Sequence, residues 1–153
     1  MKGRRPDGID PVLRSRARKR ALQAVYAWQM NGGSADRVIE EFAHEQVREQ
    51  ADLAYFEDLL RGVIGKLADI DKALAPFLDR SVDQVDPIER GVLRLSAYEL
   101  LYHQDVPYRV VINEAIETAK RFGADHGHTY VNGVLDKACA EWRAAEFAAA
   151  RRR

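Results

Sequence analysis

The stretch that decides the fold is DPIERGVLRLSAYELL, residues 86–101. Its first four residues have the chemistry of a helix start. Asp86 can cap the helix, Pro87 suits the first turn, and Glu89 can reach back to the cap amide. Apolar side chains then fall on nearly every side of this helix, which predicts that it lies at the centre of the fold.

Other segments on both sides of this helix also carry apolar residues at helical spacing. They cover about residues 13–30, 35–50, 52–77, 107–122 and 128–142, and glycine or proline marks most of their ends. No segment alternates polar and apolar residues over several positions, as a half-buried strand would. The sequence therefore predicts an all-α fold, a compact bundle of about six to seven helices.

Length and composition favour a single cytoplasmic domain. The chain has 153 residues, of which 46% are hydrophobic and 31% are charged. Its single cysteine, Cys139, cannot form an internal disulfide, which fits a reducing compartment. The first residues do not resemble a signal peptide, and no stretch approaches the roughly 20 apolar residues of a membrane span. We expect a helical domain over residues 14–142, with flexible extensions at 1–13 and 143–153.

The net charge of zero hides an uneven distribution. Residues 1–20 hold eight basic and two acidic side chains, a sum of +6, so the remaining residues sum to −6. A mildly acidic body with a basic head indicates one localised anion-binding site and other surface for a protein partner.

The basic head is densest in the seven residues 14–20. On a helix, Arg14 and Arg18 would share one face, whereas Arg16 and Arg20 would share another. Positive charge crowded at the positive end of the helix dipole favours a polyanion as the compensating ligand. We expect RNA rather than DNA, because no helix-turn-helix is evident and arginine-rich segments ordinarily target flexible RNA. The full basic cluster is Arg14, Arg16, Arg18, Lys19 and Arg20.

Two aromatic residues follow on the same predicted helix. Tyr26 could stack on bases, whereas the spacing of Trp28 favours a place in the core. An alternative remains open: a protein-interaction module whose basic head binds RNA nonspecifically or binds an acidic partner.

Catalytic and metal-binding patterns are weak. The four histidines, His44, His103, His126 and His128, do not combine with cysteine or carboxylate into a metal set. Cys139 adjoins an apolar stripe and is expected to be a buried, inert thiol. A lone carboxylate within the apolar helix, Glu99, is expected to make a structural ion pair or a capping bond. The sequence predicts no catalytic residue, no metal and no cofactor.

Four stretches, taken together in their order and spacing, resemble the NusB family of bacterial transcription antitermination factors. The resemblance covers about residues 13–142. The stretches are RARKRALQAVYAWQ (16–29), IERGVLRLSAYEL (88–100), VPYRVVINEAIETAK (106–120) and YVNGVLDK (130–137).

The resemblance implies a fold of two packed three-helix groups. It also implies binding of boxA RNA together with NusE, a small-subunit ribosomal protein, in an assembly with other Nus factors and RNA polymerase. That assembly supports processive transcription of ribosomal RNA operons. Homodimers that bury the arginine-rich helix are plausible for the family. The same domain type precedes a methyltransferase domain in an rRNA methylase, but this chain ends after its last predicted helix, so we expect no enzyme.

The resemblance also assigns site residues. Glu89 and its neighbourhood are expected to contact NusE. His126 and His128 replace a more acidic stretch expected at this loop, a change that would strengthen RNA contact at lower pH. The RNA-binding residues implied are Arg14, Ser15, Arg16, Arg18, Lys19, Tyr26, His126, His128, Thr129 and Tyr130.

Overall fold

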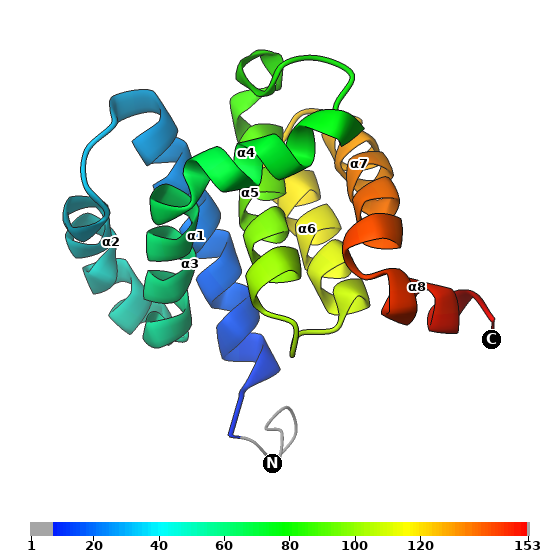
Figure 1. Ribbon diagram of the computed structural model, residues 1–153. Coiled ribbons are helices and arrows are strands. Elements are labelled where there is room, and N and C mark those ends of the chain that lie inside the picture. Colours follow the sequence, from blue (N-terminus) through cyan, green and yellow to red (C-terminus); the bar gives the residue numbers. More distant parts are fainter. Residues whose placement is uncertain (1–7, 153) are drawn as a thin grey trace. The chain divides into compact units, whose positions relative to one another are not determined.

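The computed structural model describes residues 8–152, except the side chains of residues 44–49 (Figure 1). The described residues form α-helices and two short 3-10 helices and contain no strand, which confirms the all-α prediction. Eight α-helices are present in this part of the chain, slightly more than expected. None of these described helices is long and apolar enough to cross a membrane. The chain divides into two compact units, Met1–Gly65 and Lys66–Arg153.

The first unit is a three-helix group of α1 (Pro11–Asn31), α2 (Ala35–Glu49) and α3 (Leu53–Gly65). Each of these helices packs against the other two. Their shared core contains fully buried large side chains from α1 and α3. These are Leu22, Val25, Phe56, Leu59, Leu60 and Val63.

Helix α1 begins earlier than the sequence suggested. The Asp10 carboxylate accepts hydrogen bonds from the N–H groups of Val12 (2.9 Å) and Leu13 (3.3 Å) and so caps the helix. Residues 11–13 are therefore helical, although they were expected to belong to a flexible extension. The rest of that extension, residues 1–7, lies outside the described residues. The helix ends at Gly32, whose φ of 72° is the left-handed conformation that glycine adopts without strain.

The second unit is built around α5 (Pro87–Tyr102), which packs against α4 (Leu67–Leu74), α6 (Tyr108–Phe122) and α7 (Gly127–Trp142). Eleven residues of α5 are buried: Glu89 and all ten residues from 91 to 100. This agrees with the central place that the apolar residues on nearly every side of the helix predicted. Asp86 caps the helix by accepting a 2.9 Å hydrogen bond from the N–H of Ile88. Two 3-10 helices, Ala75–Phe77 and Val82–Gln84, lie between α4 and α5 in the chain.

An ion pair joins α4 to α5. Arg94 donates two hydrogen bonds to the Asp71 carboxylate, from Nε (3.0 Å) and Nη2 (2.9 Å). The Arg94 side chain is buried and that of Asp71 is largely so. This bidentate pairing fixes the approach of the two helices.

Residues 144–151 form a further helix, α8 (Ala144–Arg151), where the sequence suggested a flexible tail. The residue before it, Arg143, is 4% exposed, and its guanidinium donates to carbonyl groups in the last turn of α5 and just after it. The acceptors are Leu100 (2.9 Å), His103 (3.0 Å) and Val106 (2.9 Å). Cations are favoured at this negative end of a helix.

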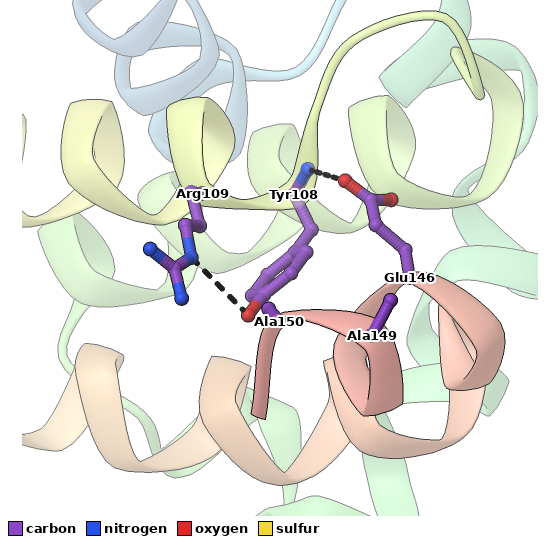
Figure 2. Close-up of a pocket in the computed structure, with 5 residues that line it drawn as sticks. All are labelled: Tyr108, Arg109, Glu146, Ala149 and Ala150. Atoms are coloured by element: carbon purple, nitrogen blue, oxygen red, sulfur yellow. Dashed lines mark hydrogen bonds between the residues drawn. The ribbon is translucent and has the colours of Figure 1, made fainter. Parts of the chain in front are cut away.

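Helix α8 is also tied to the start of α6 (Figure 2). Glu146 accepts a 2.9 Å hydrogen bond from the Tyr108 N–H and a 2.7 Å bond from Arg143. The ring of Phe147 packs against that of Tyr108, with centroids 5.6 Å apart. An open cavity of about 260 Å³ lies here, lined by Tyr108, Arg109, Glu146, Ala149 and Ala150.

Candidate nucleic-acid interface

The arginine-rich segment divides between two faces of α1. Arg14 and Arg18 share one face, as predicted, and both lie over the ring of Tyr55 on α3. Their guanidinium carbons are 3.9 and 5.4 Å from its centroid, within the range of a cation–π contact. Arg18 is only 7% exposed. These two arginines therefore hold α1 against α3, whereas the sequence suggested that they face RNA.

Asp52 also lies at the contact between α1 and α3. Its carboxylate accepts a 3.0 Å hydrogen bond from the Tyr55 N–H at the start of α3, and one of its oxygens lies 4.0 Å from Nε of Arg14. The Asp52 N–H donates to the Leu13 carbonyl at 3.1 Å. Asp52 thus offsets part of the positive charge of Arg14 and Arg18 on the face of α1 that packs against α3.

The opposite face of α1 presents a different set, which we call the outer stripe: Val12, Arg16, Lys19, Tyr26 and Met30. These positions are separated by three, four or seven residues and so lie along one side of the helix. Tyr26 is 38% exposed and Arg16 is exposed, whereas Lys19 is half-buried and donates to the Ser15 hydroxyl at 3.0 Å. Cationic side chains interleaved with aromatic and apolar ones suit the backbone and bases of single-stranded RNA.

Trp28 does not belong to the outer stripe. Its indole N–H donates to the Gly33 carbonyl at 3.0 Å, and its side chain is half-buried. This bond ties the end of α1 to the following turn. Trp28 is thus only partly buried, whereas its spacing in the sequence favoured a place in the core.

The remaining RNA-binding residues predicted from the sequence lie in the second unit, at the start of α7. His126 and Thr129 are exposed, whereas His128 and Tyr130 are half-buried. His126 adopts a φ of 71°, an uncommon conformation for a residue with a side chain. These four residues therefore lie together: His126 is in the turn before α7, and the other three are in the first residues of α7.

Glu89 lies beneath this turn rather than on the surface. It is 4% exposed, and a Cβ placed on Gly127 would overlap its Oε1 and come within 2.8 Å of its Cδ. Only glycine fits at position 127 without displacing the carboxyl group. The carboxyl groups of Glu89 and Asp86 also interact with each other, and Oε2 of Glu89 is buried without another hydrogen-bond partner among the described residues. A contact with NusE at this place stays a prediction and would fall on the neighbours of Glu89.

The surroundings of Glu89 favour its protonated form, whereas those of Asp86 favour its ionised form. Burial, followed by the hydrogen bond to Asp86, raises the pKa of Glu89 from 4.5 to about 7. The same bond holds the pKa of Asp86 below its usual range. Protonated Glu89 is therefore the donor and the ionised Asp86 carboxylate is the acceptor.

We expect the stability of the protein to fall as the pH rises from about 4.5 to above 7. In this range the folded chain keeps the Glu89 proton that the unfolded chain has released, so each rise in pH favours unfolding. Glu89→Gln should flatten this dependence and be more stable than the wild type at pH 8, by on the order of 2 kcal/mol. Urea unfolding at pH 5, 6, 7 and 8 measures the effect. The exposed Glu117→Gln is the control, and parallel curves for wild type and Glu89→Gln would contradict the raised pKa of Glu89.

Residues considered for catalysis show no catalytic arrangement in the described part of the chain. Cys139 is fully buried, and burial raises the pKa of its thiol to about 12, so it is not a nucleophile at neutral pH. No group of three or more metal-ligating side chains gathers among the described residues. The side chain of His44 is not described.

Comparison with known proteins identifies the family. The model of the NusB family matches residues 15–140, which include α1 to α7 almost completely. The chain belongs to the NusB family. The matched range ends before α8, so this last helix lies outside it.

Curated relatives in the NusB family are similar along nearly the whole chain. Transcription antitermination protein NusB of Xanthomonas axonopodis pv. citri (strain 306) is 74% identical over 147 residues, which are 96% of this chain and 92% of the relative. The protein of the same name from Xanthomonas oryzae pv. oryzae (strain PXO99A) is 73% identical over 96% of this chain and 94% of its own.

Solved structures of the NusB family share the fold. NusB of T. maritima is 31% identical, with a TM-score of 0.75 over 88% of this chain and 96% of that one. A NusB chain in a crystal structure of NusB and NusE with double-stranded RNA has a TM-score of 0.73 at 22% identity. This comparison covers 90% of this chain and 98% of the other.

Proposed function

We propose that this chain is a transcription antitermination factor that binds boxA RNA together with NusE and supports processive transcription of ribosomal RNA operons. The observation that carries the proposal is 74% identity, along 96% of the chain, to a transcription antitermination protein NusB. The RNA and NusE in the crystal structure of a protein of the same fold agree with this role.

The outer stripe of α1 is the proposed RNA contact in the first unit. Arg16 and Lys19 supply positive charge for backbone phosphates, and Tyr26 supplies an exposed ring for a base. Arg14 and Arg18 contribute by holding α1 in place, because their guanidinium groups lie over Tyr55. In the second unit, His126, His128, Thr129 and Tyr130 are the proposed contacts.

The chain acts in this proposal by binding rather than by catalysis. It joins RNA, NusE, other Nus factors and RNA polymerase, and it does so in the cytoplasm, where bacterial transcription takes place. The acidic surface around the start of α5 is the proposed site for NusE.

The test is an affinity measurement with two RNAs of equal length, a boxA sequence and a scrambled one. Fluorescence anisotropy should show tighter binding of the full chain to boxA RNA, and NusE should tighten it further. Equal affinity for the two RNAs, with and without NusE, would overturn the proposed specificity and favour a nonspecific basic head.

A further inference from the structure

In the second unit, Tyr130 forms a cluster with two exposed residues that the sequence alone did not point to, Asp79 and Arg80. The Asp79 carboxylate accepts hydrogen bonds from Arg80 Nε (2.7 Å) and Nη2 (2.9 Å). It also accepts a 3.1 Å bond from the Tyr130 hydroxyl. The Arg80 guanidinium carbon lies 5.2 Å from the centroid of the Tyr130 ring. One carboxylate thus fixes an arginine beside an aromatic ring.

The contacts within this cluster favour the protonation states that its hydrogen bonds require. The hydrogen bond from Arg80 is the largest influence on Asp79 and lowers its pKa to about 2. Burial and the bond to Asp79 raise the pKa of Tyr130, so its hydroxyl stays a donor. At neutral pH the Asp79 carboxylate is therefore ionised and the Tyr130 hydroxyl is protonated.

The cluster leaves binding capacity on Arg80. Nε and Nη2 serve Asp79, and among the described residues no partner is seen for Nη1. The side chain is 46% exposed. A guanidinium edge of this kind binds phosphate oxygens, and an adjacent ring offers a stacking surface for a base.

The first unit contains an arginine, a tyrosine and an aspartate in a similar arrangement. There the tyrosine is buried, so the arrangement serves packing rather than binding. Arg14 lies over Tyr55 and near Asp52, but Tyr55 is 5% exposed, so that cluster only packs helices. In the second unit the arginine is open to solvent, and an exposed surface ion pair contributes little to stability.

The cluster also adjoins residues already assigned to RNA. Arg80 and Tyr130 line a cavity of about 230 Å³ together with His126. The same cavity is lined by Asp86, Glu89 and Asp125, and the carboxylates of Asp86 and Asp125 disfavour several phosphates. A single phosphate at the Nη1 edge of Arg80 is the contact that this charge pattern permits.

We propose that Arg80 is a further RNA-binding residue, which contacts one backbone phosphate while the Tyr130 ring beside it stacks on a base. This inference rests on the proposed function, because it adds a contact to the same RNA. It assigns Asp79 the role of a positioning residue that holds Arg80 and Tyr130 together.

The experiment compares Arg80→Ala with Arg151→Ala in the full chain. Arg151 is a matched control, because it also pairs with an aspartate, Asp136 at 3.6 Å, and lies over a ring, Phe147 at 4.7 Å. Fluorescence anisotropy with a labelled single-stranded boxA RNA, repeated over a salt series, gives the affinity and its salt dependence.

We expect Arg80→Ala to weaken RNA binding roughly three- to tenfold and to reduce the slope of log affinity against log salt by about 0.7, the value for one phosphate on a single strand. Arg80→Lys should lie between wild type and Arg80→Ala, and Arg151→Ala should bind as the wild type does. Equal affinities and slopes for Arg80→Ala and Arg151→Ala would overturn the inference.

Two further outcomes separate the inference from the proposed function. If Arg80→Ala weakens only the binding of NusE, the cluster is a protein contact and the RNA assignment is wrong. If the wild type does not distinguish boxA from scrambled RNA, the proposed specificity fails, yet a lower slope for Arg80→Ala would still support a phosphate contact. A wild type that binds neither RNA would overturn both.

Discussion

Replacing Arg143 with methionine is expected to lower the free energy of unfolding by about 3–5 kcal/mol. The buried guanidinium donates to the carbonyl groups of Leu100, His103 and Val106, and it pairs with Glu146 of α8 at 2.7 Å. Methionine fills a similar volume but supplies no donor. The carbonyl groups lose their charged partner, and Glu146 loses its counter-ion. Urea unfolding followed by circular dichroism measures the loss.

The control is Arg151→Met, which removes an exposed arginine from α8 itself. Its partner Asp136 is 3.6 Å away and both side chains are mostly exposed, so we expect a change of about 0.5 kcal/mol or less. If Arg143→Met were as stable as Arg151→Met, the buried guanidinium would not be what docks α8.

Replacing Asp71 with alanine is expected to cost about 3 kcal/mol. The variant leaves the Arg94 guanidinium buried beneath α4 without the carboxylate to which it now donates two hydrogen bonds. A buried charge that loses its partner keeps its desolvation cost and loses the attraction that offset it. The same unfolding experiment gives the magnitude.

A double variant separates loss of the pair from loss of packing. Arg94→Met combined with Asp71→Ala removes both charges, so it should recover much of the stability that Asp71→Ala loses. If the double variant were less stable than Asp71→Ala by the full effect of Arg94→Met alone, the two side chains would act independently and the pair would not link α4 to α5.

The sequence predicts the helices best where local chemistry marks their ends. Asp86 and Pro87 place the start of α5 correctly, because capping depends only on neighbouring residues. The segment predicted as one helix over residues 52–77 instead forms two helices. Helix α3 ends at Gly65, and α4 begins at Leu67. Apolar spacing continues across this break, so periodicity cannot reveal it.

The C-terminal helix could not be predicted, because its stability depends on distant partners. An alanine- and arginine-rich stretch has the composition of a fraying tail. Arg143 and Glu146 find their partners about 40 residues earlier in the chain, around the α5–α6 connection. Only the folded chain brings these groups together.

The arginine-rich segment shows the same limit at the candidate site. Helical spacing correctly places Arg14 and Arg18 on one face, but it cannot tell which face packs against another helix. That depends on Tyr55 of α3, which lies under both guanidinium groups. We therefore propose Arg16 and Lys19 as the phosphate contacts of the first unit. Arg80 was missed because an arginine beside an aspartate resembles an ordinary surface pair.

The most direct test of this account is the salt dependence of boxA RNA binding by the double variant Arg16→Ala with Lys19→Ala. The control is Arg37→Ala with Arg61→Ala, which removes two exposed charges from α2 and α3. We predict that loss of Arg16 and Lys19 weakens binding roughly tenfold or more and lowers the salt slope by about 1.4, whereas the control leaves both unchanged. An unchanged slope for the first variant, or equal losses in the two, would contradict it.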